Sequence, residues 1–492
     1  MGEPTDSFQE TDRKSRLTHF FLIVIATLCL AFGFVNNSFG VADSTWFKNH
    51  QKDTQGHVIG NLIRSSSHGL WEHSGLNGIN QSRPPYWKLE RPWNGGLAQQ
   101  QHQMYLDGTS KEHYNPYFSQ PGGQAWVFIA LDKLTNKQPE EKLQLYRWIT
   151  GFSSAFILSL LLSWLLKVGG WGAALVAGVS MVYSPWLTVF GANLWWFFSS
   201  FFIPMAITAL ATGRASSPKL KMWFFLSGLG IFIKGFLTGF EYISTTLVMA
   251  QIPLILDLVR RNDSLQCSLA RLLASCFGSI AGAVLTILLL CIQISIYRGD
   301  TMAGLDHILH SYQKRSSGAK ENLNRHYNYG LEADVEEIVK GYRQGVCFDL
   351  DSKPLRERKD HSEDSFMRPF RYDDLISTLK ILSLVWLVWA MLFSSIRWAL
   401  ISFLLATWCS LLGPLSWFII FKGHSSVHWH MNYICWHMPF SFMVAAMVGI
   451  TGEYILKATW WPVSKLFKLN KKEAQTQKEP EEKKPTASTS QP

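Results

Sequence analysis

Charged residues are scarce in this chain. Only 17% of its 492 residues are Asp, Glu, Lys or Arg, whereas 47% are hydrophobic and 21 are Trp. An ordinary globular domain is about one quarter charged, so this deficit argues against a typical soluble protein and indicates a protein of the lipid bilayer. The many Trp and Phe residues fit the aromatic belts of membrane interfaces. The net charge is +10, and we expect it to follow membrane topology, with no nucleic-acid partner.

Paired cysteines and internal repeats are also lacking. The seven Cys residues form no CxxC pair and no Cys/His spacing typical of zinc, so we interpret them as small buried hydrophobes. No period of 20–50 residues recurs, and no inverted repeat typical of a transporter is present.

Apolar runs of span length recur along the chain, and they predict an all-α polytopic membrane protein with about ten transmembrane helices. Two Asn residues, rather than a small-residue cleavage site, follow the first run, so we interpret it as an uncleaved helix. A shorter apolar run, 125–131, predicts a helix lying at the interface. The predicted spans are 17–35, 149–166, 171–190, 193–210, 222–237, 242–258, 272–296, 375–393, 398–421 and 433–456.

The short basic loops fix the predicted orientation, because Lys and Arg favour the cytoplasmic side. This rule places both termini in the cytoplasm, with 1–16 as a polar start and 461–492 as a disordered tail. The region 17–460 then forms one transmembrane domain whose long polar segments, 36–145 and 298–373, lie outside. The inner basic residues are Lys167, Arg214, Lys219, Lys221, Arg260, Arg261 and Arg397.

Independent segments place ionisable or amide side chains at the outer ends of these spans. Such groups are costly beside lipid and often mark functional sites, so we expect one site on the outer face. Lys and Arg there would bind a phosphate, and nearby Trp residues would stack on sugar rings. The candidates from these segments are Asp43, Asp53, Asn193, Lys234, Glu241, Arg325, Lys422, His428, His430 and Asn432.

Asp53 precedes TQGHVIGNLIRSSSHG, in which an apolar stripe runs from Val58 to Ile63. An Asp that heads a helix is a good N-cap, and capping alone explains its place. A carboxylate at the bilayer boundary also suits removal of a proton from an acceptor hydroxyl, or binding of a divalent metal. Asp43, before Ser-Thr-Trp, is a second plausible cap and the rival candidate.

Two other patterns have simpler alternatives. Glu241 and Lys234 are seven residues apart, so they suit a structural ion pair as well as a site. His424, His428 and His430 include an i, i+4 pair that suits a metal on a helix. Because no acidic ligand is near them in sequence, we favour hydrogen bonds to phosphate or sugar.

Several motifs resemble those of the GT-C superfamily, polytopic glycosyltransferases that use polyprenyl- or dolichyl-phosphate sugars. Asp53 opens an amphipathic helix that ends near Gly69, and YFSQPGGQAWVFIALDKL resembles the superfamily's Pro/Gly-initiated juxtamembrane helix. YRWITGFSSAFILSLLLSWLL is similar to its second span, which commonly opens with an Arg. SPWLTVFGANLWWFFSSFFIP and KGFLTGFEYIST resemble motifs of bacterial members.

This resemblance implies transfer of a sugar from a polyprenyl-phosphate donor to a glycan, lipid or protein acceptor, at the outer face of a bacterial inner (plasma) membrane. Asp53 would be the general base or metal ligand, supported by Asp43 or Glu241. Some members need a divalent cation and others do not, so the resemblance leaves the cofactor open, with Mg or Mn at Asp53 as one alternative. We prefer Asp53 over Asp43 because only Asp53 heads the patterned helix. The implied phosphate and substrate contacts are Gln120, Arg147, Asn193, Lys234, Arg325, Lys422, His428, His430 and Asn432.

Two other classes remain open. A transporter or flippase of lipid-linked glycans needs polar groups near the bilayer midplane, whereas these gather at one edge. A non-catalytic membrane scaffold that binds a partner through its outer loops does not need this one-sided gathering.

Overall fold

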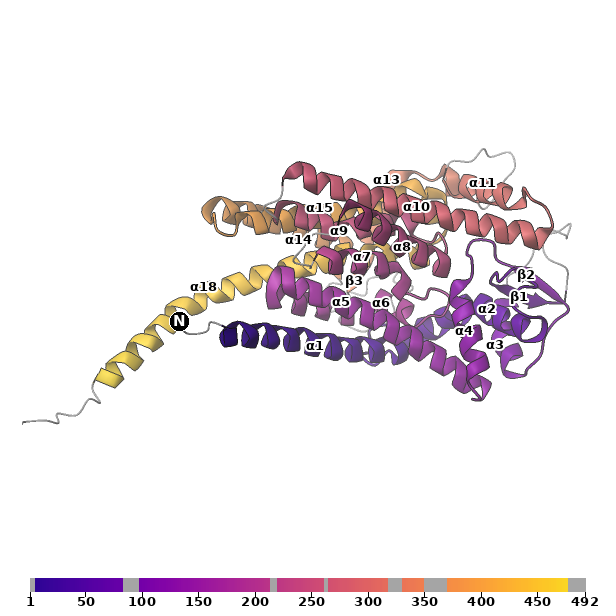
Figure 1. Cartoon of the computed structure of the whole chain (residues 1–492), viewed down its shortest axis with the longest axis horizontal. Helices are drawn as coiled ribbons and strands as arrows, with labels where there is room; N and C mark the ends of the chain where they lie inside the picture. Colours follow the sequence, from indigo (N-terminus) through magenta and orange to yellow (C-terminus); the bar gives the residue numbers. More distant parts are fainter. Residues whose placement is uncertain are drawn as a thin grey trace, which may run out of the picture.

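The computed structural model describes residues 5–82, 97–212, 219–260, 264–316, 330–348 and 370–476. Within these ranges most residues are helical, and the strands form two small two-stranded sheets. The long helices lie side by side along the longest axis of the molecule (Figure 1). The fold is therefore a helical bundle, as the apolar runs predicted.

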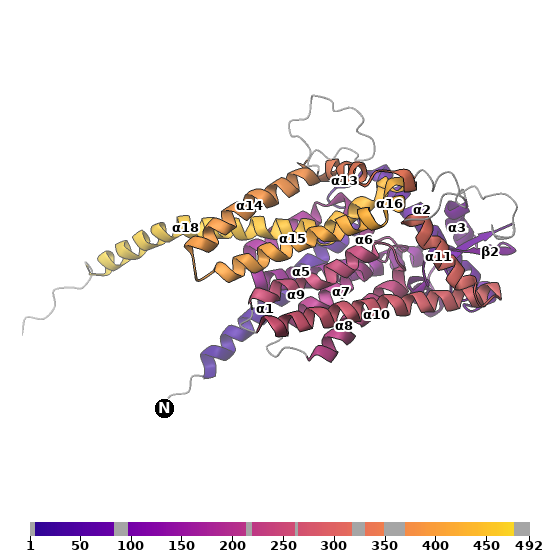
Figure 2. The ribbon, with the colours of Figure 1, turned by 90° about the horizontal axis from the view of Figure 1, so that it is seen from above.

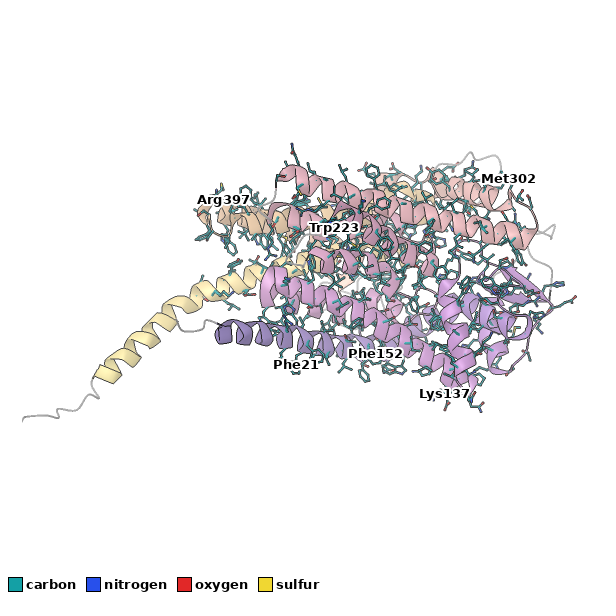
Figure 3. The ribbon with its side chains drawn as sticks, viewed as in Figure 1. Phe21, Lys137, Phe152, Trp223, Met302 and Arg397 are labelled. Carbon is teal, nitrogen blue, oxygen red and sulfur yellow. The ribbon has the colours of Figure 1, made fainter. Side chains whose placement is uncertain are left out.

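Seven helices of the described residues are long and apolar enough to cross a membrane. Their outer surface carries apolar side chains, such as Phe21 and Phe152, which point away from the bundle (Figure 3). Such a surface is typical of contact with lipid, so these helices are those of an all-α membrane protein. The spans are Arg16–Asn36 of α1 (Thr5–Asn36), α5 (Pro139–Val182), α8 (Leu220–Thr238), α10 (Leu265–Arg298), α14 (Tyr372–Leu392), α15 (Arg397–Ile420) and Tyr433–Thr459.

The total of about ten spans remains a prediction. Two further apolar helices, α7 (Ser199–Thr212) and α9 (Ile243–Arg260), are shorter than the seven. In addition, α5 contains a sharp turn at Gly170, which has φ 83° and ψ −173°. The predicted runs 149–166 and 171–190 thus lie on either side of one glycine. The helix that contains the second run ends at Val182, and the last residues of that run belong to α6 (Pro185–Gly191).

Glycines allow several helices of the bundle to approach closely. A Cβ at Gly228 would lie 2.9 Å from the backbone oxygen of Gly278, so α8 and α10 touch through their main chains. Gly172 of α5 and Gly449 of α18 (Phe440–Thr476) meet in the same way. Small residues at such crossings are typical of helix packing in membranes, where van der Waals contact drives association.

The polar elements of the first long segment gather at one end of the bundle (Figure 1). We name it the α2 end, after α2 (Ser44–His68). It also holds α3 (Leu97–Leu106), α4 (Gly123–Leu134) and a sheet in which β1 (Gly78–Gln81) pairs antiparallel with β2 (His113–Pro116). The helix predicted for 125–131 is thus present as α4.

The second polar segment also contributes to this end, through α11 (Ala303–Arg315) (Figure 2). After it come α13 (Val335–Gln344) and a sheet of β3 (Val346–Phe348) with β4 (Phe370–Arg371). Three short helices then join α15 to α18: α16 (Lys422–Val427), α17 (Trp429–Asn432) and η3 (Tyr433–His437).

The opposite end, which we name the Gly170 end, holds the turn of α5 and the connection between α14 and α15 before Arg397 (Figure 3). The helix α18 extends beyond it, and α1 begins near it (Figure 1). The helix α18 continues to Thr476, so residues 461–476 have a helical backbone where the sequence predicted disorder. The remainder of that tail lies outside the described residues.

Candidate functional site

The helix that we expected to begin at Asp53 begins at Ser44. Asp43 is its N-cap, because its carboxylate accepts hydrogen bonds from the backbone N–H groups of Thr45 and Trp46, at 3.0 and 2.8 Å. Asp53 therefore lies inside α2, and the prediction that it heads the helix is wrong. The error arose because the first turns, STWFKNHQK, lack the apolar stripe that marks the later ones.

Two aromatic contacts hold α2 on either side of residue 53. The ring of Trp46 lies 4.9 Å from that of Trp186, and the ring of His57 lies 5.0 Å from those of Tyr117 and Trp195. Positions 53 and 57 are one turn apart on the same face of the helix. The backbone thus places position 53 beside this aromatic group, while the Asp53 side chain lies outside the described part of the chain.

His57, Tyr117 and Trp195 form an aromatic trio, since the rings of Tyr117 and Trp195 are also only 5.1 Å apart. Burial lowers the pKa of His57 to about 4, so its imidazole is neutral at physiological pH. Its Nδ1 has no hydrogen-bond partner among the described residues. A neutral ring with an unmatched polar atom suits a polar ligand that presents a hydroxyl group.

Lys234 is fully buried near the end of α8. Its Nζ donates hydrogen bonds to the main-chain oxygens of Gly239, at 2.7 Å, and Glu241, at 2.5 Å, and lies 4.9 Å from the centre of the Phe201 ring. The predicted pairing of Lys234 with Glu241 therefore runs through the backbone of Glu241. The carboxylate of Glu241 is left to make another contact.

That contact is His424 of α16. Oε2 of Glu241 lies 3.7 Å from Nε2 of His424. Nδ1 of His424 lies 3.5 Å from Nδ2 of Asn432, which donates to the Tyr342 hydroxyl at 3.2 Å. This hydroxyl in turn donates to the main-chain oxygen of Ser425. These residues come from the segment just before α9 and from α13, α16 and α17. The sequence predicted that polar residues from separate segments would lie together, and these four do.

Lys314, at the end of α11, is a charged neighbour that the sequence did not single out. Burial lowers its pKa to about 8; the adjacent Arg315 also lowers it, while the carboxylate of Glu241 raises it in part. Arg315 donates a hydrogen bond to the hydroxyl of Ser119 at 3.1 Å, which ties α11 to the loop before α4. The sequence contained one signal, a basic pair at the end of HILHSYQKR.

Gln120 and Gln124 connect this region to the aromatic trio. Nε2 of Gln124 donates to Oε1 of Gln120 at 2.6 Å and to the main-chain oxygen of Trp195 at 3.2 Å. Gln120 also packs against Gly239, where a Cβ would lie 3.0 Å from its Cα. Nε2 of Gln120 and Oε1 of Gln124 are buried without a partner among the described residues. Buried amide atoms of this kind usually bind water or a ligand.

We name these groups the outer cluster, although its position outside the membrane is still a prediction. It is the part of the α2 end where the predicted Gln120, Lys234, Glu241 and Asn432 meet residues that sequence reasoning did not assign to the site. The outer cluster consists of His57, Tyr117, Gln120, Gln124, Trp195, Lys234, Glu241, Lys314, Tyr342, His424 and Asn432.

The structure places the other predicted residues differently. Asn193 caps a turn, because its Oδ1 accepts from the backbone N–H groups of Trp195 and Trp196. Arg147 of α5 lines a separate pocket with Trp148 of the same helix and with Lys137, which precedes that helix. This arrangement gives Asn193 a local structural role and does not bring Arg147 into the outer cluster.

Three predicted residues come from the segments around α16 and α17, and one from the second polar segment. Lys422 is half-buried at the start of α16, next to His424 in sequence. The ring of His428 lies 4.4 Å from that of His424. His430 belongs to α17, but its side chain is not among those described, and Arg325 lies outside the described residues altogether.

The described side chains do not form a metal site. Among them, no three His, Cys, Asp or Glu side chains are grouped so that they could hold a metal ion. Glu241 and His424 alone would supply two ligands, fewer than protein metal sites commonly provide. The side chains of Asp53 and His430 are outside this comparison, so Mg or Mn at Asp53 stays an open alternative.

No protein-family model, curated protein or solved structure matches this chain. The likeness to the GT-C superfamily therefore rests on the sequence motifs alone.

Proposed function

We propose that this chain is an integral-membrane glycosyltransferase of GT-C-like architecture. It would move a sugar from a polyprenyl-phosphate donor to a glycan, lipid or protein acceptor at the outer leaflet of a bacterial plasma membrane. The observation that carries the proposal is the meeting of Lys234, Glu241 and His424, all buried, at one end of an apolar helical bundle. Burying ionisable groups beside lipid is costly, and such groups usually serve a function.

The distribution of basic residues supports the proposed orientation. Lys167, Arg260 and Arg397 lie at the Gly170 end, where α1 begins and beyond which α18 extends (Figures 1 and 3). Because Lys and Arg are enriched on the cytoplasmic side, the Gly170 end would be cytoplasmic. The outer cluster at the opposite end would then face the outer leaflet.

In the proposed reaction, Asp53 is the general base. Its carboxylate takes the proton of an acceptor hydroxyl, and the acceptor oxygen bonds to the anomeric carbon. The bond from that carbon to the phosphate oxygen breaks, and its electron pair leaves with polyprenyl phosphate. A well-placed base of this kind contributes about 10²–10⁴-fold to rate.

The surroundings of the two acidic positions on α2 favour Asp53 over Asp43. Asp43 is occupied in capping α2, whereas position 53 shares the helix face of His57, beside the aromatic trio. The trio offers ring faces for a sugar, because aromatic rings bury the apolar face of a ligand and leave its hydroxyl groups free to pair. His57, Gln120 and Gln124 offer polar atoms for those hydroxyl groups.

Two kinds of cation have different proposed roles. Lys314 and Lys422 are only partly buried, so they would bind the donor phosphate, with Arg325 as the predicted third contact. The ammonium group of Lys234 is already bonded to two main-chain oxygens. It is therefore a positioning residue that orients the carboxylate of Glu241 toward His424.

The one-sided position of the outer cluster also weighs against the transporter alternative. A transporter of lipid-linked glycans needs its substrate groups near the bilayer midplane, where both sides can reach them. The groups that meet here lie where spans end: Lys234 near the last turn of α8, and Glu241 before α9 begins.

The test is a transfer assay in membranes that contain the expressed full chain. The probes are polyprenyl-phosphate hexoses with a radiolabelled sugar, offered to cell-envelope extract as acceptor. We expect label to move from the lipid fraction to the acceptor only when the chain is present. Absence of transfer from the whole hexose series, with correctly inserted protein, would overturn the proposal.

A further inference from the structure

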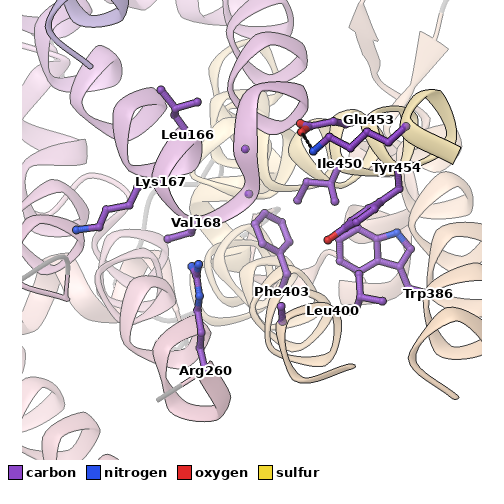
Figure 4. A pocket seen from close by; sticks show the side chains of 14 residues that line it. Leu166, Lys167, Val168, Arg260, Trp386, Leu400, Phe403, Ile450, Glu453 and Tyr454 are labelled. Carbon is purple, nitrogen blue, oxygen red and sulfur yellow. Dashed lines mark hydrogen bonds and ion pairs between the residues drawn. The ribbon is translucent and has the colours of Figure 1, made fainter. Parts of the chain in front are cut away.

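A pocket of about 300 Å³ lies at the Gly170 end, far along the bundle from the outer cluster. Five separate parts of the chain line it (Figure 4). They are the turn of α5 around Gly170, the end of α9 at Arg260, Trp386 of α14, the first turns of α15 and a stretch of α18 around Glu453. Because it is formed by distant segments, the pocket is a product of the tertiary fold.

Positive charge exceeds negative charge around this pocket. Its lining includes Lys167, Arg260 and Lys457, and Glu453 is the one acidic side chain among the described residues that line it. Both oxygens of Glu453 are engaged: Oε2 accepts from the backbone N–H of Gly172 at 2.6 Å, and Oε1 pairs with Lys457 at 2.5 Å. The negative charge of Glu453 is therefore largely compensated inside the protein.

Arg260 makes no ion pair with the acidic residues that the structure describes. Its guanidinium points toward Val168 and lies apart from Glu453, while Lys167 extends along the far side of the α5 turn (Figure 4). A guanidinium group presents a planar fork of N–H donors that matches the oxygens of a phosphate. The guanidinium group of Arg260 is thus a strong hydrogen-bond donor for an anion, and the described acidic residues do not neutralise its charge.

The rest of the lining is apolar or aromatic. Leu400 and Phe403 form one side, and Trp386 and Tyr454 form the other (Figure 4). The Trp386 ring is fixed in place, because its Nε1 donates to the hydroxyl of Thr451 at 2.8 Å. Trp and Tyr are typical of the boundary between lipid tails and head groups. Apolar side chains contribute nothing to the binding of a free anion, whereas the first methylene groups of a lipid would pack against them.

We propose that this pocket binds the phosphate head group of an anionic phospholipid. Arg260 bonds the phosphate oxygens, Lys167 adds long-range attraction, and the aromatic side receives the start of the acyl chains. Basic pockets between membrane helices on the cytoplasmic side bind lipid head groups in this way. The site is distinct from the outer cluster and does not depend on sugar transfer.

The experiment is native mass spectrometry of the purified full chain in detergent. The added probes are phosphatidylglycerol, phosphatidylcholine with the same acyl chains, and inorganic phosphate as the free anion. We expect the protein to retain phosphatidylglycerol at least about fivefold more than phosphatidylcholine, since each nearby cation contributes modestly to binding an anionic lipid. Millimolar inorganic phosphate should not displace it.

Two substitutions and one control make the test specific. Arg260→Gln should remove most of this preference, and Arg260→Lys should retain part of it, because the charge remains and the planar fork is lost. The control is Lys221→Gln, which removes an exposed charge near the start of α8, outside the pocket lining.

Each remaining outcome counts against the proposal. Equal retention of the two lipids by the wild type, or an unchanged preference in Arg260→Gln, would overturn it. Displacement of the lipid by inorganic phosphate would show that the pocket selects a free anion instead. If Arg260→Gln fails to fold, the partial loss in Arg260→Lys and the phosphate competition with wild type still decide the question.

Discussion

The carboxylate of Glu241 lies 3.7 Å from Nε2 of His424, and both side chains are less than one tenth exposed. The two residues are far apart in sequence and meet where α9 and α16 begin near the α2 end. Lys234 stabilises this arrangement, because its Nζ donates a hydrogen bond to the main-chain oxygen of Glu241. A buried carboxylate held against an imidazole is a common arrangement for controlling a proton.

Glu241→Gln is expected to reduce sugar transfer about 100-fold, because the neutral amide removes the carboxylate that faces His424. His424→Gln should cause a similar loss. If the two side chains act as a unit, the double substitution costs little more than either single one. Initial rates in membranes with matched protein levels measure this. Strictly additive losses would contradict a joint role for the pair.

The lowered pKa of Lys314 predicts the pH above which activity declines. Because burial lowers its pKa to about 8, it is protonated below pH 8 and loses its positive charge as pH rises through 8. A phosphate contact that depends on this charge weakens there, so the KM for the polyprenyl-phosphate donor should rise above pH 8. Lys314→Arg should move this limit upward, since the guanidinium stays charged. An unchanged profile in Lys314→Arg would exclude this role.

Acid should destabilise the protein partly through His57. Burial lowers its pKa to about 4 in the folded chain, against an ordinary value of 6.5. Between these values the unfolded state binds more protons, so stability is full above pH 6.5 and falls as pH drops toward 4. His57→Phe keeps an aromatic ring and should make the thermal unfolding temperature fall less steeply over this range. His73, whose pKa burial also lowers to about 4, should retain part of the dependence.

Gly170→Ala should destabilise the fold by about 1–3 kcal/mol. Its φ of 83° is unfavourable for a residue with a Cβ, and that Cβ would lie 2.9 Å from the carboxylate of Glu453. The matched control is Gly452→Ala in α18, where a Cβ meets nothing within 4 Å. Alanine favours a helix there, so the control should be neutral or slightly stabilising. Thermal unfolding in detergent measures both, and equal unfolding temperatures would contradict the account of the α5 turn.

Hydropathy predicted the membrane helices well because one physical requirement dominates them. The first predicted span, 17–35, matches Arg16–Asn36, and the run 398–421 matches Arg397–Ile420. A long apolar run in lipid must satisfy all of its backbone hydrogen bonds internally, and the α-helix does so within a single segment. The sequence also correctly indicated that Lys234, Glu241 and Asn432 lie in one region.

Other features of the fold could not be predicted, because they depend on contacts between residues that are far apart in sequence. The pairing of Gly78 with Pro116 joins β1 to β2 across a long separation in sequence, within the long polar segment 36–145, where we predicted no strand. Lys314 comes close to Glu241 only because α11 packs beside α16. The start of α2 was missed for a local reason, because the cap at Asp43 precedes turns without apolar periodicity.

The most direct test of the central claim compares Asp53→Asn with Asp43→Asn in the transfer assay with polyprenyl-phosphate hexoses. The account predicts that Asp53→Asn inserts and folds normally but loses transfer at least about 100-fold. Asp43→Asn should retain most of its transfer, because Asn is also a good helix cap. Full transfer by a correctly inserted Asp53→Asn protein would contradict the account.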